Sequence, residues 1–269
     1  VDGIWRQFRT TIGFWQGLRA QVPEDQEARE ALETLYEAAG RWHAVVDLLN
    51  EDVDRYDADT PRMIETLRRI VEVYENHLEA PAKAIAAWQA LLDVDPHHFE
   101  AMDALAMAYE ALGRWPDLAR ILEQKAESLP DIVGQLETRR KLAQLMLTRF
   151  ASSSEAVRHY EALLKLEPFD AEALSELKRL YLERHDHEAY VQLSRRELEA
   201  LPVNLQEVPL RELCRYATKR LRQTNTPRQL WESLLAQQPE DLESLRALST
   251  IYQRSAAYED LSKIWAELS

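Results

Sequence analysis

The chain has 269 residues, of which 46 % are hydrophobic and 30 % charged, and its formal net charge is −14. This composition supplies enough apolar residues for a continuous core and argues against a disordered chain. The acidic excess argues against a DNA- or RNA-binding protein, because binding to polyphosphates depends on a basic surface. The single cysteine, Cys214, allows no internal disulfide and no cysteine-based zinc site, which favours a cytoplasmic protein.

No apolar segment reaches the eighteen or so residues that cross a bilayer, so we expect no direct membrane insertion. The sequence opens at Val1 without an initiator methionine or a signal sequence, and we interpret it as a fragment. Whether the parent protein carries a signal peptide or a membrane anchor stays open. The excess of arginine over lysine favours a bacterial source.

In chain order, the apolar pattern first predicts one helix near residues 4–20, interpreted as the second helix of an incomplete pair, 1–23. Seven helix pairs follow, near residues 24–60, 61–96, 97–130, 131–168, 169–202, 203–239 and 240–269. Prolines such as Pro96, Pro130 and Pro168 close these pairs, because a proline just beyond a helix end cannot continue the helix. The sequence therefore predicts an all-α protein, with a single repeat array over 1–269.

Two patterns alternate along this array with a period of about 72 residues. The first places a tyrosine four residues after a leucine, at Tyr36, Tyr109, Tyr181 and Tyr252. The second places an aromatic residue eight residues before a proline, at Trp15, Trp88, Tyr160 and Trp231. Gly40 and Gly113 follow the first two tyrosines, where a helix C-terminus with positive φ favours glycine. The regular spacing indicates that these aromatic residues fill the space between helices.

This pattern resembles the tetratricopeptide repeat. Residues 104–130 show it best, with Leu105, Ala106, Tyr109, Gly113, Leu122 and Pro130, and residues 84–96 and 156–168 carry its alanine, aromatic and proline positions. The alternate pairs depart from it, because they run to 37 or 38 residues and place Leu147 or Thr218 where the tyrosine is expected. Half-a-TPR relatives therefore stay as an alternative for the repeat type. The resemblance implies a right-handed α-solenoid of about seven helix pairs plus one extra N-terminal helix, with a concave groove that binds peptides or partner domains.

Catalytic and metal-binding motifs are not visible. The sequence shows no phosphate-binding glycine-rich loop and no nucleophile motif. The close histidines, His97 with His98 and His185 with His187, lack the further ligands that a metal site needs. The acidic run at 51–59 lacks the glycine and the glutamate of a calcium-binding loop. We therefore predict no enzyme, no cofactor and no metal.

One polar position recurs with the repeat, at Arg68, Arg140 and Arg211, with Arg215 one turn after the last. These three in-register residues, the arginine row, are expected to point outward into the groove and to pair with carboxylates of a partner. The alternative is pairing with glutamates one turn away on the same helix. A second candidate surface is the apolar N-terminal end, with Trp5 and Phe8, which a preceding repeat would normally cover.

These features favour a protein–protein interaction scaffold that binds an acidic protein or peptide partner and assembles a larger complex. Homo-oligomerisation stays open. The alternative is a regulatory repeat region of a longer enzyme or signalling protein, whose catalytic part lies outside this sequence.

Overall fold

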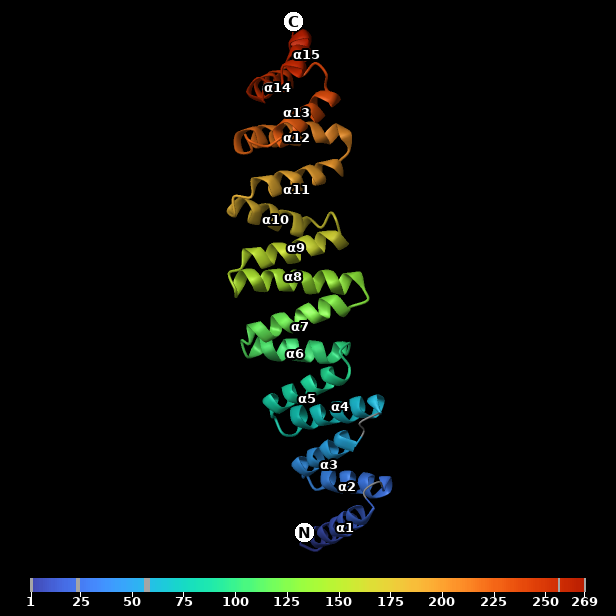
Figure 1. Ribbon diagram of the computed structural model, residues 1–269. Coiled ribbons are helices and arrows are strands. Elements are labelled where there is room, and N and C mark those ends of the chain that lie inside the picture. Colours follow the sequence, from blue (N-terminus) through green and yellow to red (C-terminus); the bar gives the residue numbers. More distant parts are fainter. Residues whose placement is uncertain (1, 23–24, 56–58, 256, 269) are drawn as a thin grey trace. The chain divides into compact units, whose positions relative to one another are not determined.

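A computed structural model describes residues 2–22, 25–55, 59–255 and 257–268; the side chains of residues 2–8, 203, 258, 263, 265, 267 and 268 lie outside this description. The described residues form fifteen helices and no strand (Figure 1). The predicted all-α, TPR-like fold class, with seven helix pairs after one N-terminal helix, is confirmed.

The first helix, α1 (Asp2–Gln21), is followed by seven helical hairpins, each made of two consecutive helices joined by a short turn. Their helices are α2 (Gln26–Ala38) and α3 (Trp42–Arg55), α4 (Thr60–Asn76) and α5 (Pro81–Val94), α6 (Phe99–Ala111) and α7 (Trp115–Ser128), α8 (Ile132–Thr148) and α9 (Ser153–Leu166), α10 (Ala171–Glu183) and α11 (His187–Glu199), α12 (Val203–Arg220) and α13 (Thr226–Gln237), and α14 (Leu242–Ser255) and α15 (Tyr258–Leu268).

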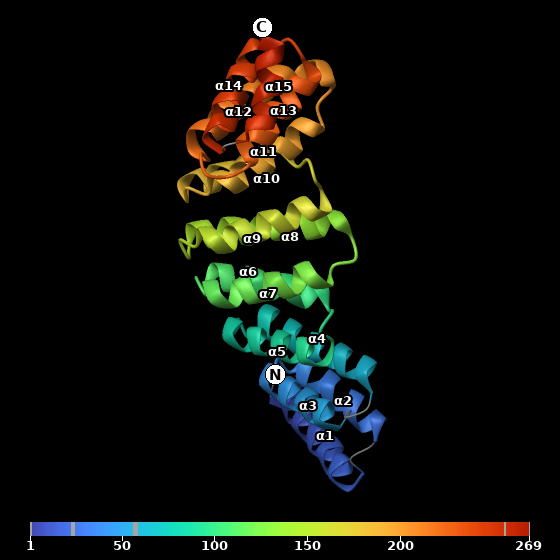
Figure 2. The same cartoon turned by 45° about the horizontal axis from the view of Figure 1, so that its top comes forward.

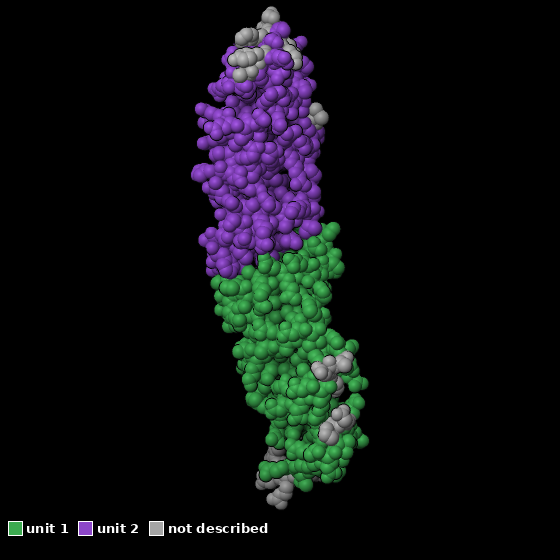
Figure 3. Space-filling view, viewed as in Figure 1, with its two compact units in different colours: residues 1–138 green, residues 139–269 purple. Residues whose placement is uncertain are grey.

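The chain divides into two compact units, residues 1–138 and 139–269 (Figure 3). The division falls within the residues of α8. Within each unit, helices that follow one another in the sequence pack against one another, as α1 to α6 do in the first unit and α9 to α15 in the second (Figure 2). Such packing between sequence neighbours is the pattern of a repeat protein. A single array over 1–269, with the repeat limits given above, stays a prediction.

Helix length alternates with the 72-residue period. The first helices of the alternate hairpins, α4, α8 and α12, have 17, 17 and 18 residues. The first helices of the other hairpins, α2, α6, α10 and α14, have 13 or 14. At 3.6 residues per turn, the difference is about one helical turn. This extra turn is the physical reason why the alternate hairpins exceed the length of the tetratricopeptide repeat.

The turns after the first three in-register tyrosines share one geometry. Gly40, Gly113 and His185 have φ values of 65°, 67° and 57°, in the left-handed region. The amide of the residue after each of them donates to the carbonyl of the tyrosine at 2.8 Å, from Arg41 to Tyr36, from Arg114 to Tyr109 and from Asp186 to Tyr181. This is the Schellman pattern that ends many helices. In the third copy His185 adopts the conformation for which the first two copies use glycine.

The four in-register tyrosines are core residues, with at most 7 % of their surface exposed. Each phenol hydroxyl is bonded to the residue twenty positions earlier, at 2.7 Å for Gln16 with Tyr36 and at 2.6 Å for Gln89 with Tyr109, Glu161 with Tyr181 and Glu232 with Tyr252. A buried hydroxyl without a partner would be costly, so this pairing permits the repeated burial. Burial and the hydrogen bond to Glu232 raise the pKa of Tyr252 to about 12.

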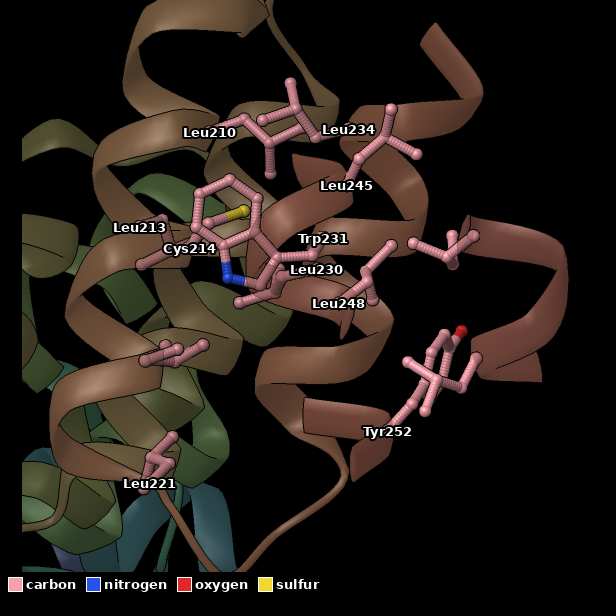
Figure 4. Packing of buried hydrophobic residues seen from close by; sticks show 14 residues of the cluster. Leu210, Leu213, Cys214, Leu221, Leu230, Trp231, Leu234, Leu245, Leu248 and Tyr252 are labelled. Carbon is pink, nitrogen blue, oxygen red and sulfur yellow. The ribbon is translucent and has the colours of Figure 1, made fainter. Parts of the chain in front are cut away.

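In the core of the second unit, a tryptophan packs the helices of an alternate hairpin against each other and against the next helix. Trp231 lies in the middle of an apolar cluster, with Leu213 and Cys214 of α12 on one side and Leu248 of α14 on the other (Figure 4). Its indole Nε1 donates to the Thr218 hydroxyl at 2.8 Å. Trp231 is 2 % exposed. The aromatic residue that the repeat spacing assigns to packing therefore anchors α12, α13 and α14 together.

Candidate binding groove

The arginine row is bound by carboxylates of the chain itself. Arg68 Nη2 lies 3.0 Å from Glu100, Arg140 Nε lies 2.8 Å from Glu172, and Arg211 Nη1 lies 3.2 Å from Glu243. In all three copies the carboxylate stands 32 residues after the arginine. The acceptors are in the first turns of α6, α10 and α14, where the helix dipole favours negative charge. Each arginine therefore joins the first helix of one hairpin to the first helix of the next.

Burial of these ion pairs increases along the row. The Arg68 side chain is 54 % exposed, that of Arg140 27 % and that of Arg211 17 %. The two more buried arginines also bind the N-cap aspartates, Arg140 to Asp170 at 2.7 Å and Arg211 to Asp241 at 2.8 Å. The alternative pairing, with a glutamate one turn away on the same helix, occurs at Arg211, whose Nη2 lies 3.3 Å from Glu207. The signal for the longer-range pairs is the recurrence of Glu100, Glu172 and Glu243 with the same period.

Arg215 binds Glu243 through both Nε, at 2.6 Å, and Nη2, at 2.7 Å. These hydrogen bonds lower the pKa of Glu243. The other predicted surface residues, Trp5 and Phe8, belong to α1, but their side chains lie outside the described part. Among the described residues of α1, Ile12 is buried and Phe14 is 65 % exposed.

An open groove of about 1200 Å³ lies along α2, α3 and α4 in the first unit and also includes Trp88 and Glu100. We call it the polar groove. Its lining holds more carboxylates than arginines: Asp25, Glu33, Asp52, Glu65, Glu72, Glu75 and Glu100 against Arg29, Arg55, Arg62, Arg68 and Arg69. Arg68 is the one residue of the arginine row in this lining.

Ion pairs hold the arginines of the groove in place. Asp52, only 3 % exposed, accepts from Arg29 Nε at 2.5 Å and lies 3.3 Å from Arg19 Nη2. These three residues tie α3 to α2 and α1. Arg69 on α4 is bound by Glu37 of α2 and, at 2.6 Å, by Glu72. The groove floor is therefore a set of fixed charges.

Burial raises the pKa of Glu33, which lies among these charges. The charge of the groove that is not in ion pairs is negative. Its arginines are paired, whereas Glu65 and Glu75 have no ion-pair partner among the described residues.

Three histidines of the described chain, His98, His77 and His187, have structural contacts. His98 Nδ1 caps α6 by accepting from the Ala101 amide at 3.2 Å. The ring of His77 stacks on Trp42 at 3.5 Å, and His187 Nδ1 lies 2.8 Å from the Tyr216 hydroxyl. No group of three or more potential metal ligands is present among the described residues. Of the described helices, none combines the length and the apolar character that crossing a bilayer requires.

Consecutive helical hairpins, the glycine turn after a buried tyrosine and the packed aromatic residues define an all-α repeat protein that resembles the tetratricopeptide-repeat proteins. No family model and no curated protein matches the sequence. Similar solved structures include MamA, with 15 % identity over 64 % of this chain and 88 % of that chain, at a TM-score of 0.35. They also include YrrB, a TPR protein with an unusual peptide-binding site, with 12 % identity over 74 % of this chain and 96 % of that chain, at 0.35. A tetratricopeptide repeat protein from Parabacteroides merdae has 14 % identity over 99 % of this chain and 94 % of that chain, again at 0.35. At these TM-scores the likenesses carry no information on a partner or a site.

Proposed function

We propose that this chain is a protein-interaction scaffold without catalytic chemistry of its own, and that the polar groove of its first unit holds a segment of a partner protein. The observation that carries the proposal is the groove itself, about 1200 Å³ in volume and lined by charged side chains. Sites for small molecules are commonly about 300–1,000 Å³ and mostly apolar. An open groove lined by charged side chains suits a peptide segment better.

Preorganisation supports the same function. Because ion pairs already fix Arg29, Arg69 and Asp52, a bound segment would not have to order them, and ordering side chains lowers affinity. Of the predicted site residues whose side chains are described, only Arg68 lies in this groove, so the proposal moves the site from the whole arginine row to the first unit.

The test uses the purified chain, immobilised, and a displayed library of random peptides. The groove variant is the double substitution Arg62→Glu and Arg68→Glu, because both side chains are more than half exposed and line the groove. The matched control, Arg158→Glu with Arg195→Glu, makes the same charge change on exposed positions of the second unit. As a control, circular dichroism is used to check that all three proteins have equal helix content.

Peptides enriched on the native chain are expected to bind the control equally and the groove variant at least about ten-fold more weakly, because acidic side chains of the bound segment lose their contacts with Arg62 and Arg68, and a lost charged contact costs about 1.4 kcal/mol or more. Peptides that bind the native chain and the groove variant equally would place the site elsewhere. No enrichment above an unrelated immobilised protein would overturn the scaffold proposal.

A further inference from the structure

A second, smaller cavity adjoins the polar groove. It has a volume of about 280 Å³ and shares Glu75 and Trp88 with the groove. We call it the alanine pocket, because its lining consists of Glu75, Glu79, Ala80, Pro81, Ala84, Ile85, Trp88, Ala104 and Ala108. It is smaller than most small-molecule sites and suits a single side chain of a bound segment.

The inner part of the alanine pocket is apolar and well packed. Ala84, Ile85 and Trp88 of α5 are at most 7 % exposed. Ala104 and Ala108 of α6, one turn apart, form a half-buried wall. A side chain that enters between these helices would contact carbon atoms and gain burial of its aliphatic part.

The repeat does not require alanine at the two wall positions. With the tyrosines aligned, the residues that correspond to Ala104 and Ala108 are Glu176 and Leu180 in the next copy and Ala247 and Ile251 in the last. Larger side chains are therefore accepted at the second position in both later copies, and at the first position in one of them. The space in the copy that carries Tyr109 is a feature of this hairpin and not of the fold.

The mouth of the pocket is acidic. Glu75 Oε1 accepts from the Trp88 indole at 3.1 Å, which fixes this carboxylate beside the cavity. The equivalent indole of Trp231 donates to the neutral hydroxyl of Thr218, so the indole does not need a charged acceptor. Glu79 lies in the α4–α5 turn with a φ of 45°. Both carboxylates are exposed, and within the described residues neither has an ion-pair partner.

We infer that the partner segment carries a basic side chain, lysine or arginine, whose aliphatic stem lies along the apolar lining of the alanine pocket and whose cationic end reaches Glu75 and Glu79 at its rim. Long basic side chains commonly bury the stem and leave the charge at a polar rim. Lys83, in the first turn of α5, has its Nζ 5.6 Å from the centre of the Tyr74 ring and leaves both carboxylates free. Charge complementarity therefore favours a basic residue here over the acidic partner expected from the arginine row. This inference rests on the proposed function of the polar groove.

The test measures the affinity of the peptides selected on the native chain, by fluorescence anisotropy, for two pocket variants. Glu75→Gln with Glu79→Gln removes both charges and keeps the side-chain size. Ala108→Leu fills the pocket with the residue that the next copy carries at Leu180. The matched control, Glu155→Gln with Glu183→Gln, removes two exposed charges from the second unit.

Selected peptides are expected to share a basic residue, and each pocket variant is expected to weaken their binding about ten-fold while the control leaves it unchanged. Replacing the shared basic residue of the peptide by norleucine is expected to lower affinity for the native chain and to abolish the effect of the Glu→Gln variant. Two outcomes for peptides that no longer bind the Arg62/Arg68 groove variant would overturn this inference and leave the proposed function standing. In the first, these peptides share no basic residue. In the second, they bind both pocket variants as tightly as the native chain. Failure to select any groove-dependent peptide would overturn both.

Discussion

Single residues end the helices of this protein at fixed places. The turns after Tyr36, Tyr109 and Tyr181 each need one residue with positive φ, where a side chain with a Cβ costs roughly 1 kcal/mol and glycine does not. Gly40 and Gly113 meet this need, and no atom lies within 4 Å of a Cβ built at Gly40, so the conformation alone favours glycine there. His185 takes the same conformation because the flanking helices and the Asp186 amide bond to Tyr181 impose it.

We predict that His185→Gly stabilises the α10–α11 turn by about 0.5–1 kcal/mol, and that Gly40→Ala destabilises the α2–α3 turn by about 1 kcal/mol. Hydrogen exchange of the amides at 184–190 and 39–45 measures each local opening free energy. A loss of protection in His185→Gly would show that the imidazole makes a contact worth more than the backbone strain.

The buried phenols make stability depend on alkaline pH. The pKa of Tyr252 rises from the ordinary 10.0 to about 12, so the folded state holds this proton more tightly than the unfolded state does. The corresponding stabilisation is full below pH 10 and is lost as the pH rises towards 12. We expect ultraviolet titration to show a class of phenols ionising near pH 12, and Tyr252→Phe to remove one phenol from that class. If the variant titrates like the parent protein, Tyr252 is not one of these phenols.

At the scale of elements, the arginine row links helices that are not consecutive. The three in-register ion pairs have the same spacing in the sequence but differ in burial, from Arg68 to Arg140 to Arg211. An exposed pair contributes little, because water screens the charges and two long side chains lose freedom. Breaking a buried pair leaves a desolvated charge without a partner.

We therefore predict a graded series of alanine substitutions. Arg68→Ala is expected to cost less than about 1 kcal/mol, Arg211→Ala about 2 kcal/mol, and Arg140→Ala an intermediate amount. Hydrogen exchange in the second turns of α6, α10 and α14, where the amides are bonded within the helix, gives the three values separately. Equal costs at the three positions would contradict the dependence on burial.

For the whole molecule, cooperativity is expected to be local, because each hairpin in a repeat protein is stabilised mainly by its neighbours. The rate at which the single cysteine, Cys214, is chemically modified measures how far such opening is local. Cys214 is fully buried beside Trp231, and burial raises the pKa of its thiol to about 12. A thiol reagent can therefore modify it only when the second unit opens.

We predict that Arg211→Ala speeds the modification of Cys214 about 30-fold, the factor that corresponds to about 2 kcal/mol of local stability. Asp52→Ala, which breaks the buried ion pairs in the first unit, is expected to leave the rate at Cys214 unchanged while it increases hydrogen exchange in α1 to α3. An equal acceleration by both variants would mean that the chain opens as one cooperative unit.

Helices, hairpins and core aromatic residues follow from the sequence alone, because they depend on local signals. Apolar spacing defines a helix, a proline or glycine ends it, and the 72-residue period is enough to place Tyr109 and Trp88 in the core. The helical spacing likewise predicts that Leu67 and Ile70, the apolar neighbours of Arg68, are buried, as they are.

Partners and cavities depended on the tertiary structure. Which carboxylate binds Arg68 or Arg211 is decided by helices about thirty residues apart in the sequence, and no local pattern specifies that contact. The polar groove and the alanine pocket exist only where α2 to α6 meet, because their volume depends on how side chains such as Ala104 and Trp88 fill the space between helices. The sequence determined the repeat because its signals are short-range, whereas the candidate site arises from packing between repeats.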